Sequence, residues 1–136
     1  MYANDIQIRV RYAETDQMGY VYYGHYAAYF EVARVEMLRS LGFSYKILEE
    51  EGIILPVLNY SIKYIRPAYY DDLLKIKTII KDLPAARIRF DYETFNEKDE
   101  LLNIADTTLV FVNKKSGRPG APPKDFMEAI SGFFKP

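Results

Sequence analysis

The residues best suited to chemistry lie in one stretch, from Arg11 to Tyr26. Asp16 supplies a carboxylate there, and Gly19 lets the chain bend because glycine reaches backbone angles closed to other residues. A long amphipathic segment starts near Gly24, so we expect Asp16 just before the start of a helix. Such a position offers free backbone N–H groups and the positive end of the helix dipole, which can polarise a carbonyl group. The sequence therefore predicts an active site in this stretch.

Each of these residues also has a simpler interpretation. Asp16 could only close a turn through contacts with its own backbone, as Asp commonly does. His25, the one histidine, could pack or form local hydrogen bonds at the start of the helix. The neighbouring tyrosines could line a ligand pocket or pack in the core and in a dimer interface; these are Tyr22, Tyr26 and Tyr29.

Composition excludes several classes of function. The 136 residues suit a single domain, which we expect to span residues 1–136. Eighteen basic and nineteen acidic residues give a net charge of −1, which argues against nucleic-acid binding. The chain has no cysteine and one histidine, so disulfides, thiol catalysis and His-rich metal sites are excluded. No apolar stretch approaches the ~20 residues that span a membrane, and the first residues lack a signal peptide pattern. We expect a cytoplasmic protein without a metal.

Hydrophobic periodicity predicts one long helix among several strands. The helix is expected from Gly24 to Leu41, with Tyr26, Phe30, Ala33, Met37 and Leu41 on its apolar face. Arg34 falls inside this apolar arc; it could pair with Glu31 one turn back, or it could be an interface or site residue. The other expected elements are strands at 6–10, 53–66, 73–83, 86–95 and 101–113 and short helices at 44–51 and 125–134.

The order of these elements predicts the fold class. Four strands follow the long helix with short connections, which suit antiparallel pairing. One long helix must then cover one face of the sheet. We therefore predict an α+β fold in which a curved five-stranded, mainly antiparallel sheet wraps a long central helix.

Two segments resemble the signatures of the 4-hydroxybenzoyl-CoA thioesterase family of hotdog-fold enzymes. The first is Asp16-x-x-Gly19-x-Val21-Tyr22-x-x-x-Tyr26, and the second is Tyr64-x-x-Pro67-Ala68-x-x-x-Asp72. The resemblance extends from Ile6 to about Asn113 and includes the order of the elements. It implies an acyl-CoA thioesterase without a cofactor of its own. It also implies a homodimer with the two sheets joined edge to edge and the active sites at the interface, or a tetramer made of two dimers.

The resemblance also assigns roles to residues. It places the catalytic carboxylate, acting as nucleophile or as general base, at Asp16, and the carbonyl-polarising backbone amides at Tyr23 and Gly24. Thioester hydrolysis builds negative charge on an oxygen, and amides fixed at a helix N-terminus stabilise that charge. Tyr22, His25 and Tyr26 are the expected substrate-binding residues. Many family members carry His and Asn at the positions that Tyr23 and His25 occupy here, so help from an imidazole at the first of these positions is missing.

Coenzyme A carries phosphates, so we expect a local basic patch. The candidates are Arg87, Arg89, Lys114, Lys115 and Arg118, each of which could equally belong to a solvated surface. Two other functions stay open. One is a hydratase or dehydratase on the same fold that would use His25. The other is a non-catalytic module that binds an acyl ligand with its tyrosines.

Overall fold

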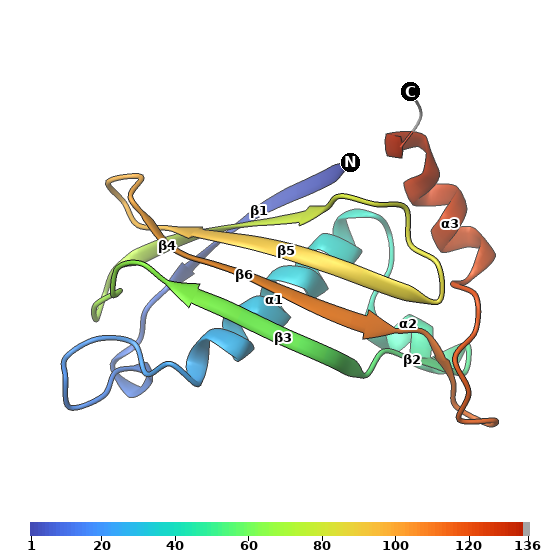
Figure 1. The fold of residues 1–136 in the computed structure, drawn as a ribbon, viewed down its shortest axis with the longest axis horizontal. Helices are drawn as coiled ribbons and strands as arrows, with labels where there is room; N and C mark the ends of the chain where they lie inside the picture. Colours follow the sequence, from blue (N-terminus) through green and yellow to red (C-terminus); the bar gives the residue numbers. More distant parts are fainter. Residues whose placement is uncertain (135–136) are drawn as a thin grey trace.

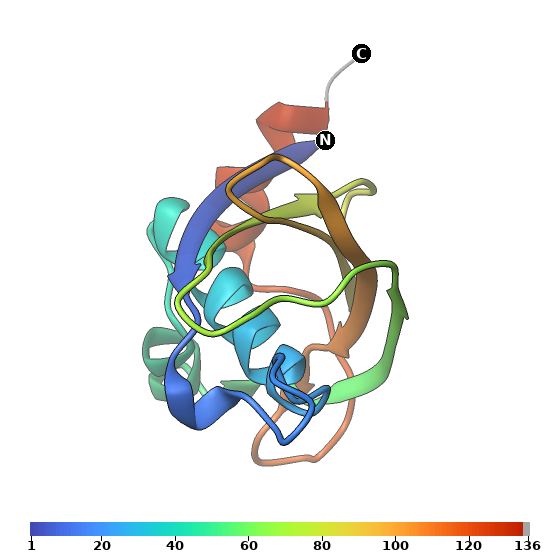
Figure 2. The ribbon, with the colours of Figure 1, turned by 90° about the vertical axis from the view of Figure 1, so that its left-hand side faces the viewer.

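A five-stranded antiparallel sheet curves around one long helix (Figure 1). The computed structural model describes residues 1–134. The strands of this sheet follow the spatial order β1 (Tyr2–Arg9), β4 (Leu73–Ile80), β5 (Arg87–Phe95), β6 (Leu101–Val110) and β3 (Val57–Tyr64). Helix α1 (His25–Ser40) lies inside the curve of the sheet (Figure 2). The predicted α+β fold, a curved antiparallel sheet around a helix, is confirmed.

The remaining elements are short. They are the 3-10 turn Tyr12–Glu14, helix α2 (Tyr45–Glu50), strands β2 (Ile53–Ile54) and β7 (Val112–Asn113), helix α3 (Lys124–Ser131) and the 3-10 turn Gly132–Phe134. Strands β2 and β7 pair with each other in a second, two-stranded sheet. Within residues 1–134, no helix is both long and apolar enough to cross a membrane.

Three predicted strands differ from the structure. The strand predicted over 101–113 is divided into β6 and β7, which belong to different sheets. The strand predicted over 53–66 is divided into β2 and β3, and Pro56, which has no backbone N–H to add to a ladder, lies between them. The first strand begins at Tyr2 rather than Ile6, because its side chains keep alternating between half-buried and exposed and pair with β4 along its whole length. The missing N–H of Pro56 thus explains the break between β2 and β3, and pairing with β4 explains the early start of β1.

The apolar stripe of α1 packs on the concave face of the sheet. Phe30 is fully buried, and its ring stacks on that of Tyr92 in β5 with 4.5 Å between centroids. Arg34 is also buried, and its Nε donates a hydrogen bond of 2.8 Å to the Tyr45 hydroxyl. No ion pair joins Arg34 to Glu31 within the described residues, so the predicted pairing with Glu31 is wrong.

The edge strand β3 is less covered than the other strands. Helix α1 lies against β1 and β4, whereas β3 pairs only with β6 among the described strands. Two β3 side chains that face the α1 side are therefore partly exposed, Tyr60 (37%) and Tyr64 (50%), and so is Leu58 (52%) at the bulge between Val57 and Asn59. This uncovered edge lies beside the segment that carries the candidate site.

Candidate active site

The loop between β1 and α1 is held in shape by its own backbone hydrogen bonds. The Asp16 amide donates to the Tyr20 carbonyl at 3.0 Å, and the Gly19 amide donates to the Asp16 carbonyl at 3.0 Å. Gly19 has φ +86°, a left-handed conformation that side chains disfavour. The bend predicted at Gly19 is therefore present, and it returns the chain toward the start of α1.

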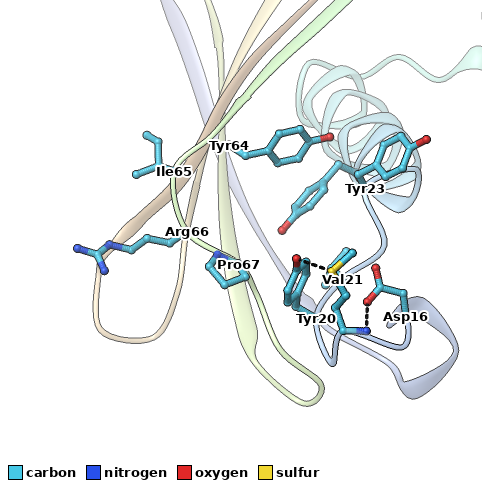
Figure 3. Close-up of a pocket in the computed structure, with 10 residues that line it drawn as sticks. Asp16, Tyr20, Val21, Tyr23, Tyr64, Ile65, Arg66 and Pro67 are labelled. Carbon is cyan, nitrogen blue, oxygen red and sulfur yellow. Dashed lines mark hydrogen bonds between the residues drawn. The ribbon is translucent and has the colours of Figure 1, made fainter.

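Asp16 forms a turn contact and also lines a cleft. Its Oδ1 accepts a hydrogen bond of 2.9 Å from the Met18 amide, which is the turn geometry of the simpler interpretation. Oδ2 accepts no hydrogen bond within residues 1–134. Figure 3 shows the Asp16 carboxylate beside the cleft, next to the loop that carries Tyr20 and Val21. The turn contact thus fixes the carboxylate and leaves one oxygen for chemistry.

Two distant segments of the chain form this cleft, which has a volume of about 440 Å³. Its lining consists of Asp16, Met18, Tyr20, Val21, Tyr23, Tyr26, Tyr64, Ile65, Arg66 and Pro67. The segments are joined by a 2.8 Å hydrogen bond from the Val21 amide to the Ala68 carbonyl and by a β-bridge between Tyr20 and Tyr69. The two sequence motifs that carry the family resemblance therefore meet in one site.

The N-terminus of α1 offers free donors at this cleft. The His25 amide donates to the Tyr22 carbonyl at 2.9 Å, whereas the amides of Tyr23 and Gly24 make no hydrogen bond within the described chain. Among residues 1–134, no side chain caps the helix start. These two amides and the helix dipole can therefore stabilise negative charge on a ligand oxygen. A Cβ added at Gly24 would lie 2.7 Å from Cε2 of Tyr22, so glycine allows the Tyr22 ring to lie close to the helix start.

Glu14 anchors the loop to the helix, and the sequence analysis did not name it. This carboxylate is only 7% exposed; its Oε1 accepts from the Arg11 amide at 2.8 Å and from the Tyr29 hydroxyl at 2.9 Å. Burial acts to raise the pKa of Glu14, but the hydrogen bonds from Arg11 and Tyr29 outweigh it and lower that pKa. The Glu14 carbonyl also accepts from the Tyr22 amide at 2.9 Å. The spacing Arg11-x-x-Glu14, a possible capping pair, was the only signal in the sequence.

The predicted substrate-binding residues separate into two groups. Tyr26 is buried and lines the cleft, with its ring 5.9 Å from that of Tyr64. Tyr22 and His25 do not belong to the cleft lining; the Tyr22 ring packs against Tyr23 at 4.8 Å and against the edge of His25 at 6.1 Å. The contact with Tyr22 matches the simpler interpretation of His25, and its role in substrate binding stays a prediction. The Tyr29 hydroxyl donates a hydrogen bond to Glu14, and Tyr29 does not line the cleft.

The predicted phosphate-binding residues lie away from the cleft of their own chain. Arg87 and Arg89 alternate along β5 with buried residues, so they lie on the outer face of the sheet. Arg89 pairs with Asp91 at 3.1 Å and with Asp106 at 3.5 Å. The other candidates, Lys114, Lys115 and Arg118, follow β7 at the end of the molecule opposite the Asp16 loop (Figure 1).

Arg66 is the basic residue of the cleft lining, and the sequence analysis had placed it only at the end of a strand. Its side chain is exposed, and its Nη1 lies 3.6 Å from Oε2 of Glu100. Within residues 1–134, no group of three or more His, Cys, Asp or Glu side chains is arranged to hold a metal ion. The cleft thus combines the Asp16 carboxylate, the Arg66 guanidinium and an aromatic wall with the free amides at the start of α1.

Comparison with known proteins assigns the chain to a family. The model of the thioesterase-like superfamily matches residues 10–130. The putative acyl-CoA thioesterase YneP of Bacillus subtilis (strain 168) is 35% identical over 119 residues, which cover 88% of this chain and 86% of that protein. The acyl-CoA thioester hydrolase YbgC of Escherichia coli O6:H1 is 36% identical over 120 residues, which cover 88% of this chain and 90% of that protein.

A similar solved structure is also a thioesterase. The DHNA-CoA thioesterase from Staphylococcus aureus matches with a TM-score of 0.93 and 37% sequence identity, and the match covers 98% of this chain and 92% of that chain. The family match over residues 10–130 includes the loop, the helix start and the strand end that form the cleft. The chain therefore belongs to the thioesterase-like superfamily, in agreement with the resemblance of its two motifs.

Proposed function

We propose that this protein is an acyl-CoA thioesterase that hydrolyses its substrate to a free acid and coenzyme A at the Asp16 cleft. One observation carries the proposal: Asp16 and Tyr23, whose amide is free at the start of α1, line one cleft, and the free Gly24 amide follows directly. The thioester carbonyl oxygen lies at the amides of Tyr23 and Gly24, and the carbonyl carbon faces Asp16. The similarity to proteins named acyl-CoA thioesterases supports this choice of substrate.

Two routes are consistent with this arrangement. As a general base, Asp16 takes a proton from water, the hydroxide attacks the carbonyl carbon, and the C–S bond then breaks to release coenzyme A. As a nucleophile, Asp16 attacks the carbon itself and the C–S bond breaks to release coenzyme A; water then attacks the Asp16 carboxyl carbon of the resulting anhydride, which releases the free acid and restores Asp16. Both routes place negative charge on the carbonyl oxygen, which the two amides stabilise. Removal of one such donor typically costs about 10²–10³ in rate. A single-turnover reaction in H₂¹⁸O separates the routes, because only the nucleophilic route places ¹⁸O in Asp16.

The walls of the cleft suit an acyl group. Tyr26 and Tyr64 form an aromatic wall beside Asp16, and we assign them to the acyl chain. The Tyr22 ring packs against the rings of Tyr23 and His25 at the start of α1, and neither Tyr22 nor His25 lines the cleft, so we do not assign them to the acyl chain. The predicted phosphate-binding residues can serve only a cleft of another subunit, because they lie away from the cleft of their own chain.

We further propose that the protein is a single-domain, cytoplasmic enzyme that forms a homodimer through β3. This strand has an unpaired edge, and its side chains on the α1 side are left half exposed. An open edge strand can pair with a second copy of itself. Tyr64 belongs both to this strand and to the cleft, so the dimer would place the cleft at the interface.

Release of thiol from a panel of acyl-CoAs tests the proposed reaction. The panel contains aromatic, short-chain and medium-chain acyl groups, and we expect free acid and coenzyme A in equal amounts. An enoyl-CoA that gains water without release of thiol would instead indicate a hydratase. Tight binding with no turnover of any thioester would indicate a binding module and would contradict the proposal.

A further inference from the structure

Met18 places an exposed sulfur atom at the candidate active site. Its side chain is 71% exposed and lines the Asp16 cleft. The chain has four methionines and no cysteine. Met37 is fully buried, Met127 packs against the core, and Met1, which is 64% exposed, lies at the other end of β1 (Figure 1). An oxidant of sulfur that enters the cleft therefore meets Met18.

Two hydrogen bonds tie Met18 to the candidate catalytic carboxylate and to the cleft wall. Its amide donates to Oδ1 of Asp16 at 2.9 Å, and its Sδ accepts a hydrogen bond of 3.0 Å from the Tyr20 hydroxyl (Figure 3). Tyr20 also lines the cleft. A thioether sulfur is a weak acceptor, yet this contact fixes the end of a flexible side chain. The position of the sulfur and the position of the carboxylate are therefore linked through one residue.

The Met18 thioether is accessible to hydrogen peroxide, which converts such groups to sulfoxides. A lone pair of Sδ attacks one peroxide oxygen, the O–O bond breaks, and the proton of the transferred oxygen passes to the departing hydroxide, which leaves as water. The sulfur is oxidised by two electrons and the peroxide is reduced by two. A cleft that admits an acyl-CoA to Asp16 also admits the much smaller peroxide, in a monomer or in an assembly.

We propose that Met18 is an oxidation site and that its sulfoxide, held in the cleft by the Tyr20 hydroxyl, slows thioester hydrolysis at Asp16. The sulfoxide oxygen projects from the sulfur that the Tyr20 hydroxyl contacts, and it is a stronger acceptor than the thioether. The hydrogen bond therefore moves to that oxygen, which shifts Met18 and adds a polar group to the cleft lining. Because the Met18 amide positions Asp16, the carboxylate shifts as well. The oxidation is independent of the proposed function, whereas its effect on turnover rests on that function.

Treatment of the full chain with hydrogen peroxide tests the proposal. Mass spectrometry of peptides measures the sulfoxide at each methionine, and thiol release measures kcat/KM for an acyl-CoA. Met18 and Met1 should be oxidised before Met37 and Met127, because the first two are exposed. We expect kcat/KM to fall by about 10–10²-fold as the sulfoxide at Met18 accumulates, since a small displacement of a catalytic group has a cost of this size. Methionine sulfoxide reductases for both epimers should restore the thioether and the rate together.

Three variants assign the effect to the sulfur of Met18. Met18→Leu keeps a side chain of similar size; whatever its starting rate, peroxide should change that rate by less than about 2-fold, although Met1 is still oxidised. Tyr20→Phe keeps the ring and removes the hydroxyl that holds the sulfoxide, so oxidation of its Met18 should slow it less than the wild type. Met127→Leu is the matched control, since it removes a sulfur from α3, outside the cleft lining, and should lose as much rate as the wild type.

The outcomes separate this inference from the proposed function. A sulfoxide at Met18 with unchanged kcat/KM overturns the inference and leaves the thioesterase intact, as does an equal loss of rate in Met18→Leu. Oxidation of Met1 without oxidation of Met18 also overturns it. If no acyl-CoA is turned over, the proposed function fails, and calorimetric binding of the same acyl-CoAs decides the inference. Weaker binding after oxidation of Met18 then supports it, and unchanged or absent binding overturns it.

Discussion

At the scale of single residues, the site depends on two carboxylates with different environments. Asp16 is partly exposed at the cleft, with one oxygen held by the Met18 amide. Glu14 is buried two positions earlier, and the Arg11 amide, the Arg11 guanidinium and the Tyr29 hydroxyl all donate to it. The exposed carboxylate is therefore available for the reaction, while the buried one fixes the loop that presents it.

Substitution of Glu14 should destabilise the protein in a pH-dependent way. Because the folded pKa of Glu14 is below its ordinary value of 4.5, its stabilising effect is complete above that pH and is lost as the pH falls through the folded pKa. Glu14→Gln should lower the free energy of unfolding by about 1–3 kcal/mol at pH 7. Urea unfolding of both proteins at pH 7 and pH 3.5 or below measures this. A difference between the proteins that stays constant with pH would contradict the assigned role.

The residue scale is also where the sequence was least informative. Asp16 and Gly19 were found because a motif and a turn need those residue types at that spacing. Glu14 and Arg66 gave no comparable signal, since nothing in their sequence neighbourhood shows what they will contact. Their roles depend on which segments meet in the fold: Tyr29 of α1 for Glu14, and the Asp16 loop for Arg66.

At the scale of elements, the loop before α1 determines where the carboxylate and the amides meet. Its shape requires the left-handed turn at Gly19, and a hydrogen bond from Val21 to Ala68 holds it against the turn after β3. The long helix and the strands themselves could be predicted because their apolar residues recur with clear periods. The break at Pro56 and the start of β1 at Tyr2 could not, because they depend on pairing between strands.

Gly19→Ala tests the requirement of this loop for a left-handed residue. A Cβ added at Gly19 would contact no other atom within 4 Å, so any loss of stability comes from the left-handed backbone conformation and not from a steric clash. We expect a loss of about 1–2 kcal/mol in the free energy of unfolding and reduced turnover as the Asp16 turn shifts. Gly120→Ala is the control, since Gly120 also has open space and its φ is not positive. Thermal unfolding and thiol release check both variants, and equal behaviour of the two would refute the role given to Gly19.

At the scale of the whole molecule, the sheet leaves its β3 edge open beside the cleft. Tyr60 and Tyr64 remain partly exposed there, although they face the side of the sheet that holds the core, and Leu58 is exposed at the bulge of the same strand. A second copy of the chain that pairs along β3 would cover them and would complete the cleft around Tyr64. The order of the strands was predictable only in part, because short connections suggest antiparallel neighbours but do not show which strand lies at the edge.

Leu58→Glu tests this assembly. A charge on the proposed interface should convert the dimer to a monomer and reduce turnover by about 10-fold or more, because a buried unpaired charge opposes association. Leu83→Glu, on the loop between β4 and β5, is an equally exposed control and should remain dimeric. Analytical ultracentrifugation measures the mass of each variant. A wild-type monomer with full activity would exclude the dimer as a part of the site.

The most direct test of the account is thiol release from acyl-CoAs by the wild type and by Asp16→Asn, measured side by side. Asparagine keeps the size of the side chain and its oxygen for the Met18 amide, so the loop should stay folded and the assembly unchanged. We predict that the wild type releases coenzyme A and that the variant loses about 10²-fold or more in kcat. Turnover by Asp16→Asn at nearly the wild-type rate would contradict the central claim that this carboxylate performs the hydrolysis.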